Sequence, residues 1–208
     1  MPPLRRFSSL IAVGVAACMA SGCGVLADPP SSLERSAQPD ETSQEPTSEE
    51  PTSPAFTPSK EAAEAGGICQ YLEFEAINEA TGQPFGVAEA GGSEEVPSCV
   101  LQTTAGSFPD ITFTRANTAT DSDTYRDEIP PKGADKIDDF GKAAYSAVRD
   151  KVKGGGPVIE VGWLTKGHMY SFRYTTAAKT SKDDAEAVVD DLVKVVEDIG
   201  KTAAKNDD

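Results

Sequence analysis

The amino-acid sequence predicts a single α+β domain, in which an N-terminal helix and a long C-terminal amphipathic helix pack on an antiparallel β-sheet. Three observations predict this fold. Residues 158–164 and 169–174 are rich in β-branched and aromatic residues and flank a Lys166-Gly167 turn, which is typical of a hairpin. Apolar residues recur at helical spacing between Ser181 and Ile199. The patterns alternate as helix, strands, short helix, strands and long helix, an order that favours layers of helix on sheet.

The first helix is expected over Cys69–Ala80. Leu72, Ala76 and Ala80 recur at four-residue spacing, and Gly82 follows as a stop signal. After it, Gly86 and Gly91-Gly92 predict turns. The remaining elements before the hairpin are a strand over 96–102, a second strand over 111–114 that pairs with it, a short helix over 121–129 and a strand over 143–148.

The aromatic hairpin supplies the expected floor of the core. Alternation places Ile159, Val161 and Trp163 on one face of the first strand. Tyr170, Phe172 and Tyr174 share one face of the second. Two readings stay open for the set Trp163, Tyr170, Phe172 and Tyr174: core packing, or the lining of a pocket for a small apolar ligand between sheet and helix.

The C-terminal helix has the clearest local signals. Ser181 with Asp184 resembles a capping box, and acidic residues suit the first turn of a helix. Gly200 is expected to end this helix. The apolar stripe that must cover the sheet consists of Ala185, Val188, Val189, Leu192, Val195, Val196 and Ile199.

Residues 1–22 are expected to be a lipoprotein signal peptide. Arg5 and Arg6 precede an almost uncharged apolar run that is short for a bilayer span, and small residues follow it. The segments Val15-Ala16-Ala17-Cys18 and Ala20-Ser21-Gly22-Cys23 both resemble a lipobox, so either cysteine is a candidate for lipid attachment.

Cysteine counting favours Cys23 over Cys18. An exported protein lies where thiols oxidise, and removal of Cys18 with the signal peptide leaves Cys69 and Cys99 as a pair. Lipidation of Cys18 would instead leave Cys23 as an odd thiol. The sequence therefore predicts a Cys69–Cys99 disulfide that joins the first helix to a strand.

Residues 23–66 are expected to form the lipidated N-terminus and a disordered tether, because Pro, Ser, Thr and Glu dominate and few large apolar residues are available for a core. The α+β domain is expected over 67–203, with a disordered tail at 204–208. The net charge is −15, which disfavours nucleic-acid and direct electrostatic membrane binding. Membrane attachment would then depend on the covalent lipid.

No pattern selects a catalytic or metal site, and no cofactor is predicted. The single histidine, His168, falls in the hairpin turn as a solvated residue, and zinc sites generally use several His or Cys ligands. Gly154-Gly155-Gly156 lacks the Lys-Ser/Thr of a phosphate loop and is expected to be a flexible loop. Asp121-Ser122-Asp123 resembles the start of a calcium loop, but Arg126 replaces the turn glycine.

Paired acids leave one enzymatic alternative open. Asp138-Asp139, Asp183-Asp184 and Asp190-Asp191 could supply the two carboxylates of a glycosidase, although such pairs also arise on solvated faces of an acidic chain.

A resemblance to a known group rests on short motifs. The lipobox, the acidic Pro/Ser/Thr tether, Cys69-Gln70-Tyr71-Leu72, Pro97-Ser98-Cys99-Val100 and the terminal amphipathic helix resemble the small uncharacterised cell-envelope lipoproteins of actinobacteria. The resemblance implies a lipid-anchored protein on the extracytoplasmic face of the cell membrane. We expect a binding or scaffolding module whose partner is an envelope protein or a small apolar ligand; a cell-wall enzyme and a purely structural component are the alternatives.

Overall fold

The computed structural model describes residues 60–206, which form the predicted α+β domain. The expected signal peptide, both lipidation candidates and most of the expected tether lie outside the described residues. The helical elements are η1 (Ala62–Ala65), η2 (Gly67–Tyr71), α1 (Phe74–Thr81), α2 (Ser122–Glu128), α3 (Lys182–Glu186) and α4 (Val189–Asn206). The strands are β1 (Phe85–Gly92), β2 (Pro97–Thr103), β3 (Asp110–Asn117), β4 (Asp135–Ile137), β5 (Ala143–Arg149), β6 (Val158–Leu164) and β7 (His168–Thr175).

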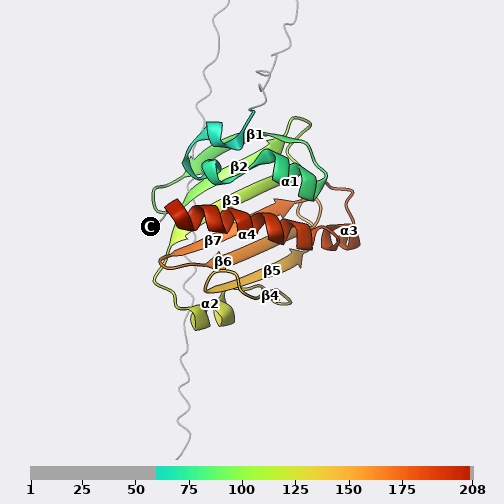
Figure 1. Cartoon of the computed structure of the whole chain (residues 1–208). Helices are drawn as coiled ribbons and strands as arrows, with labels where there is room; N and C mark the ends of the chain where they lie inside the picture. The colour runs from blue at the N-terminus through green and yellow to red at the C-terminus, as the bar shows by residue number, and fades with distance from the viewer. Residues whose placement is uncertain (1–59, 207–208) are drawn as a thin grey trace, which may run out of the picture. The chain divides into compact units, whose positions relative to one another are not determined.

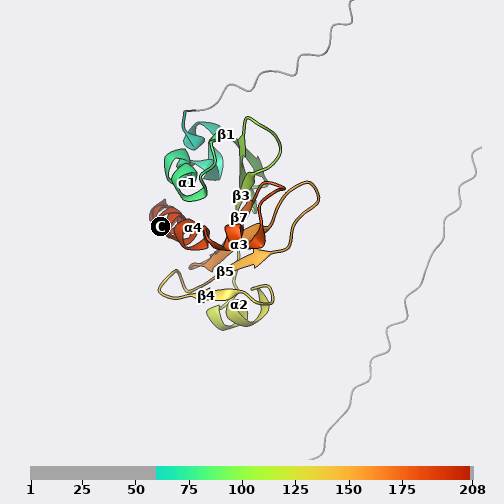
Figure 2. The ribbon, with the colours of Figure 1, turned by 90° about the vertical axis from the view of Figure 1, so that its right-hand side faces the viewer.

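The seven strands form one antiparallel sheet in the order β1-β2-β3-β7-β6-β5-β4. Helix α4 crosses one face of this sheet, and α1 with the two short helical turns lies beside it over β1, β2 and β3 (Figure 1). Figure 2 shows α1 and α4 on the same side of the sheet. No helix within residues 60–206 covers β1, β2, β3 or β7 on the opposite face, where α2 packs only at the β5 end.

The main core lies between α4 and the aromatic hairpin. The register pairs Ile159 with Tyr174, Val161 with Phe172 and Trp163 with Tyr170, so the two predicted faces coincide. The rings of Trp163 and Tyr170 stack closely, with 4.8 Å between their centroids. Leu192, Val196 and Ile199 of α4 are buried in the same core. Burial of this apolar stripe is what fixes α4 to the sheet.

The N-terminal helix prediction was wrong in detail. Cys69–Ala80 is not continuous, because Leu72 adopts an extended conformation between η2 and α1. Gly82 does end α1, in the left-handed conformation that glycine favours. Ala62, upstream of the expected domain start, is fully buried in the core.

Two glycine-rich segments also differ from the prediction. Gly86 and Gly91-Gly92 belong to β1, whose pairing with β2 compensates for weak intrinsic strand propensity. The 154–156 segment is a loop, as predicted, but part of it is buried. Gly155 and Gly156 are buried, and the N–H of Gly156 donates to the Thr176 carbonyl at 2.8 Å. A Cβ on Gly155 would lie 2.9 Å from Thr175, so close backbone approach explains the glycine there.

The C-terminal helix differs from the prediction at two points. A turn at residues 187–188 separates α3 from α4, and the helix continues through Gly200 to Asn206. Gly200 is therefore not a terminator. A Cβ at this position would lie 2.6 Å from the Phe140 ring and 3.4 Å from Trp163 Nε1. The glycine allows α4 to approach the aromatic core closely.

The Cys69–Cys99 disulfide is present and fully buried. It joins η2 to β2 across a sequence separation of 30 residues. The bridge fixes the N-terminal helical layer to the sheet, as the sequence predicted. In the chain-entropy description, a loop of this length stabilises the fold by roughly 3–4 kcal/mol.

Candidate functional site

A buried carboxylate marks the face of the sheet that α4 does not cover. Glu160 lies in the middle of β6 and is 9% exposed. Tyr145 Oη on β5 donates to Glu160 Oε1 at 2.6 Å, and Arg149 Nη1 lies 3.1 Å from Glu160 Oε2. Arg173 Nε on β7 is 3.9 Å from the same oxygen. Pairing with two guanidinium groups and a phenol compensates for the burial of this charge.

A second aromatic residue packs beside this network. Tyr125 of α2 is 1% exposed and packs against Tyr145 with 6.2 Å between ring centroids. Burial, followed by the charge of Glu160, raises the pKa of Tyr125. Gly162 makes room for both rings, because a Cβ there would lie 2.9 Å from the Tyr125 hydroxyl oxygen. Burial is also the main cause that raises the pKa of Tyr145, so both phenols stay protonated at neutral pH.

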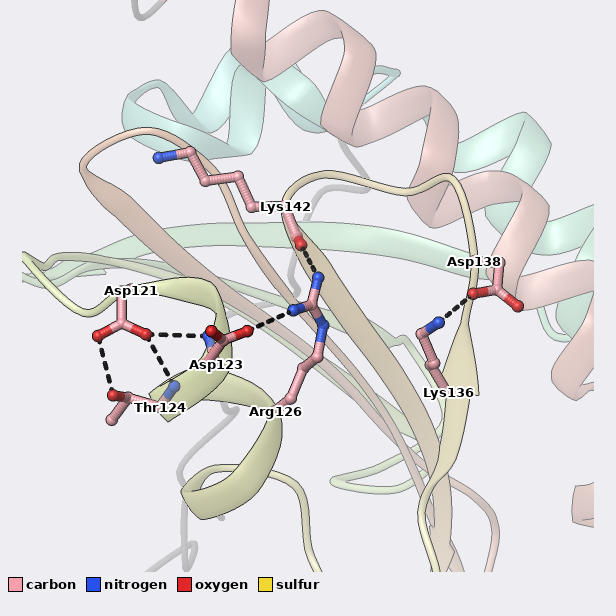
Figure 3. Close-up of polar contacts among 7 residues, drawn as sticks. All are labelled: Asp121, Asp123, Thr124, Arg126, Lys136, Asp138 and Lys142. Carbon is pink, nitrogen blue, oxygen red and sulfur yellow. Dashed lines mark hydrogen bonds and ion pairs between the residues drawn. The ribbon is translucent and has the colours of Figure 1, made fainter.

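Polar contacts hold α2 in the position that places Tyr125. Asp121 caps the helix by accepting from the backbone N–H groups of Thr124 and Asp123, and its pKa is lowered chiefly by the bonds from Thr124. Arg126 bonds to Asp123 at 3.0 Å and to the Lys142 carbonyl at 2.8 Å (Figure 3). Helix α2 is thereby tied to the start of β5. Of the two acids that resembled the start of a calcium loop, Asp121 is the helix cap and Asp123 pairs with Arg126.

A basic hollow opens next to Glu160, with a volume of about 870 Å³. Its cationic side chains come from four separate segments: Lys132 after α2, Arg149 of β5, Arg173 of β7 and Lys182 of α3. Its acids are Asp150 and Glu160. This excess of cations stands out in a chain whose net charge is −15. Guanidinium and ammonium groups in such a hollow suit a carboxylate or phosphate group of a ligand.

A smaller acidic hollow of about 340 Å³ lies beside the C-terminal end of β5, which also lines the basic hollow. Its charged lining residues are Asp135, Glu186 and Asp190, together with Lys182. Lys182 also lines the basic hollow, and Lys182 Nζ lies 3.8 Å from Glu186 Oε1. Ala147 and Val148 line both hollows. The end of β5 therefore separates the basic hollow from the acidic hollow.

The residues predicted as site candidates lie elsewhere. Trp163, Tyr170, Phe172 and Tyr174 are at most 3% exposed and pack in the main core. His168 is not a solvated turn residue: it begins β7, is partly buried and lies 6.2 Å from the Tyr170 ring. Within residues 60–206, no group of three metal-ligating side chains comes together, and no helix is long and apolar enough to cross a membrane.

The paired acids have structural contacts of their own. Asp138 forms an ion pair with Lys136 (Figure 3). Asp184 completes the predicted capping box with Ser181, which accepts from the Asp184 N–H at 3.1 Å. Asp191 lies 2.8 Å from Lys194 Nζ on the exposed side of α4. These contacts account for one acid of each pair.

Sequence reasoning missed the basic hollow. Its residues are distributed between positions 131 and 182, and only the sheet register brings them together. One signal was visible: Glu160 is an acid within an otherwise apolar strand. Such an acid requires buried partners.

The fold and the two hollows define a small α+β domain with a basic and an acidic hollow beside the end of β5. Comparison with family models, curated proteins and solved structures found no match.

Proposed function

We propose that this chain is a lipid-anchored binding module on the extracytoplasmic face of the cell membrane, and that it takes up an anionic group of its partner in the basic hollow. The observation that carries the proposal is the convergence of Lys132, Arg149, Arg173 and Lys182 in an acidic chain. A hollow with such a lining holds an anion by charge-assisted hydrogen bonds. The two arginines already have fixed positions because Glu160 pairs with both of them.

The envelope location rests on the chemistry of the cysteines. The buried Cys69–Cys99 bridge is of a kind that persists in oxidising compartments. The lipobox-like segment at Cys23 would supply the anchor, with Cys18 as the alternative. Intact-mass analysis of protein extracted from membranes should give an acylated N-terminus at Cys23. An N-terminus at Cys18, or one without lipid, would show this assignment to be wrong.

Anion binding is tested by titrating the ¹⁵N-labelled mature chain with succinate and with phosphate. We expect saturable shifts of the backbone amide resonances of Ala147, Val148 and Asp150, which line the basic hollow, with weak affinity for such small probes. Arg149→Gln combined with Arg173→Gln should remove the shifts. Lys166→Gln is the matched control, because Lys166 is exposed in the turn at the opposite end of β6. Equal responses of the control and the double variant would refute the site.

A further inference from the structure

Strand β5 extends beyond the strand that pairs with its outer edge. β4 pairs only with Ala144, Tyr145 and Ser146. Ala147, Val148 and Arg149 continue in register with β6 on the inner side. Among residues 60–206, no strand pairs with these three residues on the outer side. The backbone groups of an unpaired strand edge can accept another strand.

The two hollows flank this unpaired edge on opposite faces of the sheet. Arg149 and Glu160 line the basic hollow on the face away from α4. Ser146 lines the acidic hollow, together with Glu186 and Asp190 from the helical layer. Because side chains alternate between faces along a strand, a strand added here would direct successive side chains into opposite hollows.

We propose that the outer edge of β5 at Ala147–Arg149 binds an extended peptide segment of a partner protein by strand addition. Acidic side chains of the segment enter the basic hollow, and the basic side chains between them enter the acidic hollow. In this mode of recognition, main-chain hydrogen bonds supply affinity and recesses for alternate side chains supply specificity. The inference rests on the proposed function, and it identifies the partner as a peptide of alternating charge.

A second copy of this chain fits the edge less well. Antiparallel pairing of two β5 edges about a two-fold axis perpendicular to the sheet keeps equivalent faces on the same side. The basic hollow of one copy, with Arg149 and Lys132, would then adjoin the basic hollow of the other. Juxtaposed like charges disfavour such an assembly. Charge complementarity thus favours a different chain as the occupant.

The test uses the mature chain and two fluorescein-labelled peptides of equal composition. One is Glu-Lys-Glu-Lys-Glu-Lys-Glu-Lys, and the other is the block form Glu-Glu-Lys-Lys-Glu-Glu-Lys-Lys. Fluorescence anisotropy should show that the alternating peptide binds roughly tenfold more tightly, a difference of about 1.4 kcal/mol. Equal affinities would overturn the proposal, because a merely electrostatic surface does not distinguish the two orders.

Backbone methylation gives a second test. N-methyl groups on every other residue of the alternating peptide block the amides on one edge of its strand and leave the side chains unchanged. One methylation phase should abolish binding, and the other should retain it. Of the consecutive N–H groups of Ala147, Val148 and Arg149, those that point away from β6 should be protected from hydrogen exchange only in the complex. Equal effects of the two phases would rule out strand addition.

The outcomes separate this inference from the proposed function. If succinate shifts the amide resonances of the basic hollow but the two peptides bind equally, strand addition is wrong and anion binding stands. If neither succinate nor any peptide binds, both are wrong. A chain that forms dimers through the β5 edge, detected as a concentration-dependent mass that Val148→Lys abolishes, would replace the peptide by a second copy and overturn the inference.

Discussion

The Tyr145 hydroxyl on β5 donates a 2.6 Å hydrogen bond to the Glu160 carboxylate on β6. This bond satisfies a buried acid on the face of the sheet opposite α4, and it leaves the other carboxylate oxygen to Arg149. The phenol and the guanidinium therefore share one carboxylate, and the position of Arg149 in the basic hollow depends on Glu160.

Tyr145→Phe should destabilise the domain by about 1.5–3 kcal/mol, because the change removes a hydrogen bond to a buried charged group. The measurement is urea denaturation of the wild type, Tyr145→Phe, Glu160→Gln and the double variant. The double variant should lose less than the sum of the single losses, since the two residues contact each other. Additive losses would mean that the two residues are energetically independent.

Gly200→Ala should destabilise the domain even though alanine is the better helix former. The propensity gain is about 1 kcal/mol, whereas a Cβ 2.6 Å from the Phe140 ring adds an overpacking cost of about 1–3 kcal/mol. Thermal unfolding should show a lower midpoint, and a Phe140→Leu background should reduce the loss. A raised midpoint would show that the Phe140 ring moves aside without cost.

Leu192→Ala should cost about 2–5 kcal/mol, because Leu192 is fully buried between α4 and the sheet and its truncation leaves a cavity. Lys194→Ala is the control. The Lys194 side chain is 73% exposed, and its ion pair with Asp191 is solvated, so the change should be within about 0.5 kcal/mol. Equal denaturant midpoints for wild type and both variants would mean that α4 is not docked.

Alkaline pH should destabilise the domain through its buried tyrosines. Burial raises the pKa of Tyr174 from its ordinary value of 10.0 to about 12, and the pKa values of Tyr125 and Tyr145 are also raised, mainly by burial. Between pH 10 and about pH 12 the folded state retains protons that the unfolded chain has lost. The stabilisation is thus complete below pH 10 and falls as pH rises.

The Tyr174→Phe variant measures how much the Tyr174 proton contributes to this pH dependence. Urea denaturation at a series of pH values above 10 should give a shallower decline for the variant, by up to about 1.4 kcal/mol per pH unit. Parallel declines in wild type and variant would show that Tyr174 ionises at its ordinary pKa in the folded state.

The sequence by itself determined the elements whose signals are local. The alternation of 158–164 and 169–174 predicted the hairpin and its shared aromatic face, because a strand has a period of two residues. The Ser181–Asp184 capping box predicted the start of α3. The even count of domain cysteines predicted the Cys69–Cys99 bridge.

Tertiary structure decided the features that depend on contact partners. β1 forms despite Gly86 and Gly91-Gly92 because β2 provides the ladder, and α4 continues through Gly200 because Phe140 and Trp163 occupy the space of a side chain.

The charged hollows are also features that tertiary structure decided. Arg149 and Arg173 are 24 positions apart in the sequence and meet at Glu160 only through the pairing of β5 with β6 and of β6 with β7. Periodicity is a property of neighbouring residues along the chain, whereas a recess of converging charges is a property of register between strands. Local patterns therefore predicted the aromatic hairpin and the start of α3, whereas strand pairing decided that β1 forms and where the charges of separate strands meet.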